Sequence, residues 1–177
     1  MKNKVFASLA AVALAFAAPA MADKSAGAVV DDGAIATSVK ASLLTEKGVP
    51  SSDVNVEVYK GVVLLSGFVK TQAEKDAAGK VAKNVKDVAS VRNQLVVHPS
   101  TSMGTKLDDS LVTGKVKAAL MDAADVKSLH INVETHDGIT QLAGFVATAA
   151  MKDKAGQITA GIDGVKSDDN VLVVKPR

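Results

Sequence analysis

The sequence predicts an α+β protein made of two tandem copies of one α-β-β-α-β domain. The first observation is an ungapped match of the chain to itself at a shift of 77 residues, which pairs residues 31–97 with 108–174 and makes 28 of 67 positions identical. The second is that helical and strand patterns follow in the same order in both copies. A repeat of this length can close a small core of its own, whereas repeats of about 20–50 residues usually form solenoids.

Each copy begins with a helical pattern that is followed by a strand pattern. We expect Asp31-Asp32 to cap the first helix, whose inward face is marked by Ile35, Val39 and Leu43 at every fourth position. Copy two keeps this pattern 77 residues later. The next segments, "VNVEVY" and "INVETH", alternate apolar and polar residues as half-buried strands do.

A hairpin is expected next in each copy, with Lys60-Gly61 and Asp137-Gly138 as its two-residue turns. The second strands read "VVLLSGFV" and "ITQLAGFV". Each contains a glycine, Gly67 or Gly144, which indicates a bulge or the close approach of a helix, with a ligand at the backbone as the alternative.

The second half of each copy predicts a capped helix and a last strand. Thr71 and Glu74 have the spacing of a capping box, whereas copy two keeps Thr148 but has Met151 in place of the glutamate. The segments "VRNQLVV" and "DDNVLVV" are expected to be third strands, and the charged pair Asp168-Asp169 leaves the start of the second one open. Each domain is therefore predicted to be a three-stranded mixed sheet with two helices on one face.

This ordered set of elements resembles the BON domain. The resemblance rests on the capped first helix, the hairpin "KGVVLLSGFV", the helix end "VKDVASV" and the closing "NQLVV", and it covers residues 31–97 and 108–174. It implies a role at the cell envelope, contact with phospholipid surfaces and protection during osmotic stress. No cofactor is expected.

The first 22 residues have the features of a secretory signal peptide. Lys2 and Lys4 precede an uncharged apolar run, and small residues stand before a predicted cleavage between Ala22 and Asp23. The apolar run would span only about 21 Å of a hydrocarbon core about 30 Å thick, which argues against a transmembrane anchor. Because no cysteine follows the cleavage site, we expect a soluble periplasmic protein and not a lipoprotein.

The predicted organisation is a signal peptide at 1–22, a flexible segment at 23–30, one domain at 31–97, a linker at 98–107 and a second domain at 108–174. Cleavage removes two lysines and leaves 19 basic against 19 acidic residues. A formally neutral chain is not attracted as a whole to nucleic acid, so such binding would need a local patch. The absence of cysteine means that core packing alone must hold both domains together.

Catalytic chemistry finds little support in the sequence. Cysteine nucleophiles are absent, His98 falls in the linker, and His130 and His136 lie roughly 20 Å apart at the two ends of one strand, too far to share a metal. The polar pair that both copies share on their first strand, Asn55 and Glu57 in copy one, is not expected to converge on one site. We therefore expect no enzyme activity and no metal.

The outer face of each sheet is a candidate interaction surface. Two helices on one side leave the other side of a three-stranded sheet uncovered, and exposed apolar faces usually mark interaction sites. Either the two domains bury these faces against each other, or an external partner covers them. The candidate residues are Val62, Leu64 and Phe68 in copy one and Ile139, Ala143 and Phe145 in copy two.

A basic arc on the second helix of copy one is the other candidate surface. Lys75, Lys80, Lys83 and Lys86 are expected within about 140° of one another on the helix. Such an arc is ordinarily a solvated face; the alternative is contact with anionic phospholipid, where each lysine contributes about 1 kcal/mol. No aromatic residues lie among these lysines, which disfavours nucleic acid.

The sequence thus predicts an exported binding protein of the cell envelope. The first hypothesis is binding to a phospholipid surface. The alternative is a chaperone-like module that holds periplasmic or outer-membrane protein clients on the apolar strand faces.

Overall fold

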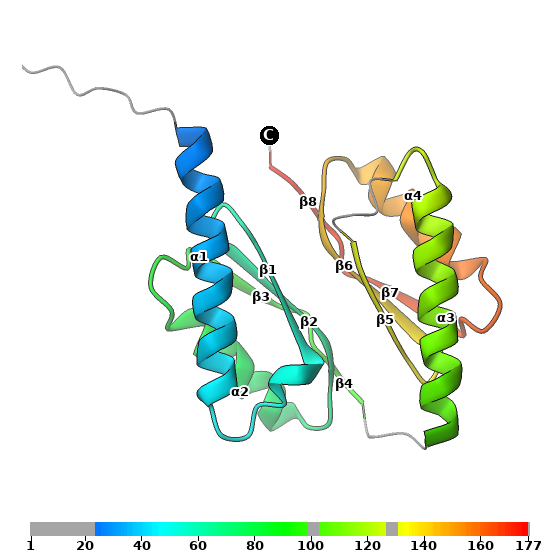
Figure 1. Ribbon diagram of the computed structural model, residues 1–177, viewed down its shortest axis with the longest axis horizontal. Coiled ribbons are helices and arrows are strands. Elements are labelled where there is room, and N and C mark those ends of the chain that lie inside the picture. Colours follow the sequence, from blue (N-terminus) through cyan, green and yellow to red (C-terminus); the bar gives the residue numbers. More distant parts are fainter. Residues whose placement is uncertain (1–23, 99–102, 127–130, 177) are drawn as a thin grey trace, which may run out of the picture.

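The order of helices and strands confirms the duplicated α-β-β-α-β pattern (Figure 1). The computed structural model describes residues 24–98, 103–126 and 131–176. The first domain consists of α1 (Lys24–Thr45), the 3-10 turn η1 (Ser51–Asp53), β1 (Val54–Tyr59), β2 (Val62–Val69), α2 (Gln72–Lys83), β3 (Ser90–Asn93) and β4 (Val96–Val97). The second consists of α3 (Met103–Asp122), β5 (Ile131–His136), β6 (Ile139–Val146), α4 (Ala149–Ala160), β7 (Ser167–Asn170) and β8 (Val173–Val174). The predicted signal segment and its cleavage site, Ala22 and Asp23, lie outside the described residues.

The long hairpin strand is the centre of each sheet. In the first domain β2 pairs antiparallel with β1 and parallel with β3 and β4. Between β3 and β4 the chain stays attached to β2, because the N–H of Gln94 donates to the carbonyl of Leu65 over 2.8 Å. The predicted three-stranded mixed sheet is therefore present, with its third strand divided into two segments.

The second domain repeats this sheet with the same register. Strand β7 pairs in parallel with β6 and includes both Asp168 and Asp169, so the last strand begins at Ser167. Pairing uses backbone groups only, and Asp168 is exposed to solvent, so its charge does not oppose the strand.

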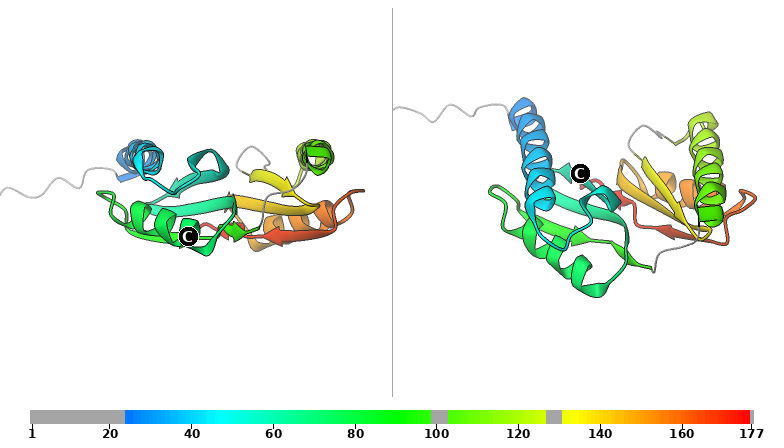
Figure 2. Two further views of the ribbon diagram at one scale, coloured as in Figure 1. Left: turned by 90° about the horizontal axis from the view of Figure 1, so that it is seen from below. Right: turned by 60° about the horizontal axis from the view of Figure 1, so that its bottom comes forward.

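One core fills the space between each sheet and its two helices. In the first domain it joins the α1 positions Ile35, Val39 and Leu43 to Ala78 and Ala82 of α2 and to the strand residues Val54, Val56, Val63, Leu65 and Val69. The equivalent apolar side chains of the second domain form a second core, whereas the positions of Val63 and Ala82 are occupied by the buried Thr140 and Thr159. Both helices thus cover the same face of each sheet, as predicted, and α1 and α3 lie at opposite ends of the molecule (Figure 2).

Each first helix begins earlier than the sequence suggests. Helix α1 starts at Lys24 and α3 at Met103, so the expected caps Asp32 and Asp109 lie inside helices. Residues 24–30, which the sequence assigns to a flexible segment, belong to α1, and α3 begins at Met103 within the segment 98–107 that the sequence assigns to a linker. Residues 24–30 include alanine, the best helix former, and continue the helix upstream.

Asp32 and Asp109, which occupy equivalent positions in the repeat, instead bind the hairpin turns. The carboxylate of Asp32 accepts hydrogen bonds from the N–H groups of Lys60 and Gly61, at 2.7 and 2.8 Å. Asp109 accepts from the N–H groups of Asp137 and Gly138 at the same distances. These bonds tie the first helix of each domain to its hairpin.

The predicted hairpin turns and the threonine caps of the second helices are confirmed. Lys60 and Gly61 have φ values of 50° and 73°, and Asp137 and Gly138 of 53° and 79°, as a two-residue hairpin turn with two left-handed residues requires. Thr71 forms a full capping box, whereas Thr148 accepts one hydrogen bond from the backbone and receives no reciprocal cap.

Replacement of the buried Asp109 with alanine should destabilise the second domain. The change removes two hydrogen bonds to a charged group and leaves the turn amides without their acceptor, so we expect a loss of about 2–3 kcal/mol in the free energy of unfolding. Denaturant titration measures this loss. The control is Asp108→Ala at the exposed neighbouring residue, and equal effects of the two changes would contradict the assignment.

Candidate functional site

The outer faces of the two sheets pack against each other. Leu64, Ala143 and Phe145 form a buried cluster that includes residues of both domains. Phe68 and Phe145 are only 4% and 7% exposed, and Val62 and Ile139 are half-buried. Of the two alternatives for the candidate apolar face, the structure adopts burial between the domains.

The ring contacts across this interface are related by the repeat. Tyr59 contacts Phe145 with ring centroids 5.5 Å apart, and Phe68 stacks on His136 at 5.2 Å. His136 and Phe145 are the counterparts of Tyr59 and Phe68 at the shift of 77 residues. The interface is therefore close to two-fold symmetric, as the interface of a symmetric dimer is.

The residues next to these ring pairs are also related by the repeat. The ammonium of Lys175 lies 4.9 Å from the centroid of the Tyr59 ring, and the ring of its counterpart His98 lies 4.8 Å from that of His136. Each end of the interface is thus built from equivalent positions. The residue types at these positions differ.

Gln141 breaks the symmetry at the centre. It occupies the position that Leu64 has in copy one and is 2% exposed. Its Oε1 accepts from the N–H of Gly67 at 2.6 Å, and its Nε2 donates to the carbonyl of Gln94 at 2.8 Å and to Asp169 at 3.0 Å. Gln141 was not among the predicted site residues. Its signal in the sequence is a polar residue where the other copy of the strand has an apolar one.

Position 67, which donates this bond, requires glycine because its backbone is left-handed and closely surrounded. Its φ is +116°, and a side chain here would collide with the backbone carbonyl of Asp53. The group that lies close to Gly67 is therefore the backbone at the end of η1, and not an α-helix as the sequence suggested.

Polar residues of both first strands also converge on the interface. Asn55 and Glu57 stand two residues apart and so share one face of the strand, although they line different cavities between the domains. Asn55 donates from Nδ2 to Glu134 across the interface at 2.8 Å. Burial raises the pKa of Glu57 to about 7, with Lys40 opposing the shift. Burial also raises the pKa of Glu134, whereas the hydrogen bond from Asn55 lowers it.

Two cavities flank the interface. One, of about 720 Å³, is lined among others by Glu57, Tyr59, Phe145 and Lys175. The other, of about 620 Å³, is lined by the counterparts Glu134, His136, Phe68 and His98. Each cavity receives residues from both domains, and so each would change if the domains moved apart.

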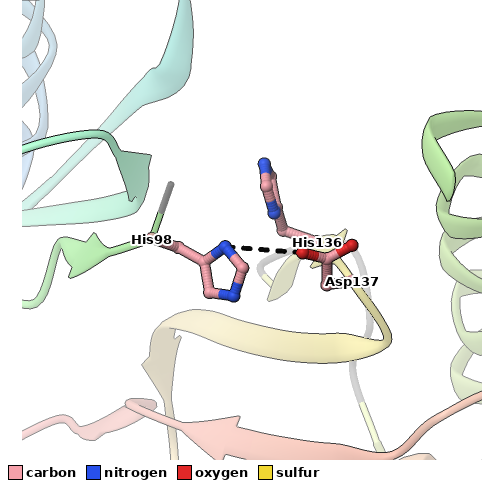
Figure 3. A group of neighbouring side chains, drawn as sticks. All are labelled: His98, His136 and Asp137. Atoms are coloured by element: carbon pink, nitrogen blue, oxygen red, sulfur yellow. Dashed lines mark ion pairs between the residues drawn. The ribbon is translucent and has the colours of Figure 1, made fainter. Parts of the chain in front are cut away.

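A group of possible metal ligands adjoins the second cavity, which is lined by two of its members, His98 and His136. One donor atom from each of His98, His136 and Asp137 lies within 4.8 Å of the other two. Figure 3 shows how the three side chains lie. Nδ1 of His98 is 3.7 Å from a carboxylate oxygen of Asp137. The sequence did not indicate this group, because His130 and His136 are far apart along one strand and His98 falls in the predicted linker. His130 lies outside the described residues.

The basic arc is placed differently from the prediction. Helix α2 ends at Lys83 with Asn84 as its C-cap, so Lys86 lies in the turn beyond the helix. Lys80, Lys83 and Lys86 are exposed, whereas Lys75 is half-buried. The exposed part of the arc therefore gathers at the C-terminal end of α2.

An exposed apolar pair on α3 was also missed. Leu107 and Leu111 stand one helical turn apart and are 71% and 66% exposed. Such a pair adds apolar surface outside the domain interface. In the described part of the chain, no helix combines the length and the hydropathy needed to cross a membrane.

The chain belongs to the BON-domain family, whose model matches residues 31–99 and 108–176. It is 41% identical over 151 residues to osmotically-inducible protein Y of Escherichia coli, covering 84% of this chain and 75% of the relative. It is 32% identical over 144 residues to the outer membrane lipoprotein DolP of Haemophilus influenzae, covering 81% and 74% of the two chains. Among solved structures, the C-terminal domain of CdsD from the Chlamydia trachomatis type III secretion system matches with a TM-score of 0.34 and 16% identity, over 82% of this chain and 67% of that one.

Removal of the Gln141 side chain should loosen the docking of the domains. Gln141→Ala leaves the buried N–H of Gly67 without an acceptor, so we expect a loss of about 2–3 kcal/mol in the free energy of unfolding. Denaturant unfolding measures the loss. The control is Gln94→Ala, because Gln94 contributes only its backbone carbonyl to this bond and its side chain is exposed. A neutral Gln141→Ala would contradict the bridging role.

Glu57 should make stability depend on pH. Its pKa is about 7 in the folded protein and about 4.5 when exposed, so the folded state binds the proton more tightly. Stability from this group is fully present below about 4.5 and is lost as the pH rises through 7. Thermal melts of the unmodified protein and of Glu57→Gln from pH 5 to 8 should therefore diverge in favour of the glutamine variant at high pH. Parallel curves would show that Glu57 is not desolvated.

Proposed function

We propose that this protein is a non-enzymatic periplasmic stress protein that binds anionic phospholipid surfaces. Three lines of support meet: the BON family, a relative named for its osmotic induction, and a relative named as an outer membrane lipoprotein. The predicted signal segment supports the periplasm as its location and a soluble state. The binding partner in this proposal is the phospholipid surface and not a small molecule.

The observation that carries the proposal is the exposed cationic end of α2. Lys80, Lys83 and Lys86 all reach solvent on one end of the first domain. Their counterparts in the second domain are Gln157, Ala160 and Asp163, so the repeat does not require basic residues there.

The expected attachment is weak and reversible. Each lysine near an anionic surface contributes about 1 kcal/mol, and the attraction falls off within a Debye length of about 8 Å at physiological salt. Three or four lysines therefore give binding that responds to salt and to lipid charge. They do not anchor the protein permanently.

A chaperone-like role is the second candidate, and it needs a surface other than the one first expected. Phe68 and Phe145 are buried while the domains are docked, so they are closed to clients. The exposed pair Leu107 and Leu111 on α3 is the observation that favours this role.

Flotation with vesicles tests the lipid proposal. Lys80→Ala/Lys83→Ala should weaken binding to anionic vesicles by about 30-fold, because two lysines together contribute about 2 kcal/mol. The matched control is Lys152→Ala/Lys154→Ala, which removes two charges from the equivalent helix α4. Absence of binding to anionic vesicles at low salt would reject the proposal and direct attention to protein clients on α3.

A further inference from the structure

We propose that His98, His136 and Asp137 form a Zn²⁺ site that joins the two domains. His98 follows β4 at the end of the first domain, whereas His136 and Asp137 belong to the hairpin of the second. Figure 3 shows the three side chains approaching one another from these two sides. This site is separate from the lysines to which lipid binding is assigned.

The donor atoms suit zinc. Two imidazole nitrogens and one carboxylate oxygen match the ligand types of open zinc sites, which have three protein ligands and one water. Calcium and magnesium prefer sites made wholly of oxygen, so this set favours a transition metal. Tetrahedral zinc needs donors about 3.4 Å apart. The present donors lie within 4.8 Å of one another, so binding one ion requires them to approach by about 1 Å through side-chain rotation.

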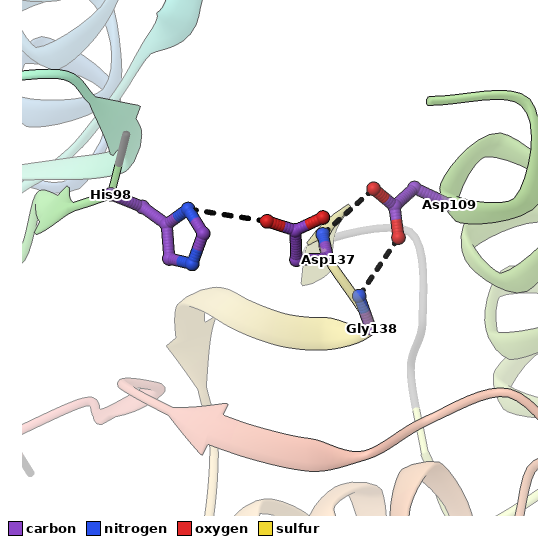
Figure 4. Close-up of polar contacts among 4 residues, drawn as sticks. All are labelled: His98, Asp109, Asp137 and Gly138. Carbon is purple, nitrogen blue, oxygen red and sulfur yellow. Dashed lines mark hydrogen bonds and ion pairs between the residues drawn. The ribbon is translucent and has the colours of Figure 1, made fainter. Parts of the chain in front are cut away.

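The ligands are held in place by neighbouring groups. The backbone N–H of His98 donates to the carbonyl of Val69 at 2.7 Å, and the ring of His136 stacks on Phe68. The turn that carries Asp137 is fixed by Asp109, which binds the N–H groups of Asp137 and Gly138 (Figure 4). Such supporting contacts are what fixes the orientation of metal ligands in proteins.

A second observation supports metal binding at His136. Nδ1 of His136 is buried and has no hydrogen-bond partner among the described residues. Buried polar atoms without a partner are rare in native proteins. A metal bound at Nδ1 would use a ring nitrogen that makes no hydrogen bond among the described residues.

The opposite end of the interface shows what this position accommodates. There Lys175, Tyr59 and Lys60 occupy the positions of His98, His136 and Asp137, and both ammonium groups lie over the tyrosine ring. That end contains cations of its own chain. At the histidine end, the same three positions contain side chains that can bind a metal.

The surrounding charge is balanced. The cavity that His98 and His136 line is also lined by three lysines and three carboxylates: Lys70, Lys106, Lys117, Asp53, Asp109 and Glu134. A divalent cation therefore does not enter a net cationic cavity. Because its ligands come from both domains, the bound ion stabilises the docked arrangement over the separated one.

Calorimetric titration of the full chain, purified without a histidine tag, with zinc chloride tests the proposal. We expect one zinc per chain, and His98→Ala and His136→Ala should each weaken binding at least tenfold. The matched control is Asp53→Asn, which removes a carboxylate from the same cavity but not from the cluster. Melting curves without zinc establish that each variant is folded.

Histidine ring signals in the NMR spectrum of the unmodified protein provide a test that needs no variant. Zinc should shift the rings of both His98 and His136 at one equivalent. The proposal is overturned by an absence of stoichiometric binding at tenfold zinc excess, by binding that survives in both histidine variants, or by ring signals that do not move.

Discussion

The second face of each small sheet is the constraint on which the rest of the structure depends. Two helices cover only one side of a three-stranded sheet, so Leu64, Phe68 and Phe145 would lie in water in an isolated domain. Duplication solves this problem, because each domain covers the outer face of the other. The cores under the helices stabilise each domain, and the buried outer faces stabilise the pair. The protein is therefore better described as an intramolecular dimer than as two independent modules.

The near-symmetry of this interface explains where the two copies were free to diverge. Most positions in the two helix-covered cores keep their apolar character, since each must fill the same space; the exceptions are Val63 and Ala82, replaced by Thr140 and Thr159. At the two ends of the interface, equivalent positions contain Lys175 over Tyr59 on one side and His98 beside His136 on the other. The exposed end of α2 has likewise kept its lysines in one copy only. Divergence is thus concentrated where new binding properties do not disturb the fold.

Most of the fold could be predicted from the sequence, because helical and strand periodicity, hairpin turns and the Thr71 cap are local signals. The helix starts could not: Asp32 looks like a cap, and only the folded hairpin shows that its carboxylate binds the turn. The candidate site was predicted in part. The apolar faces followed from strand alternation, whereas the approach of His98 to Asp137 depends on how the domains dock, which no local pattern encodes.

The most direct test of the account is an NMR measurement of nuclear Overhauser contacts between the rings of Tyr59 and Phe145, which belong to different domains. Beyond the first 22 residues the chain has only three aromatic residues of the Phe, Tyr and Trp types, so these signals are easily assigned. The account predicts cross-peaks between Tyr59 and Phe145 and between Phe68 and His136 in the unmodified protein. Two domains that tumble independently, with no cross-peak between them, would contradict it.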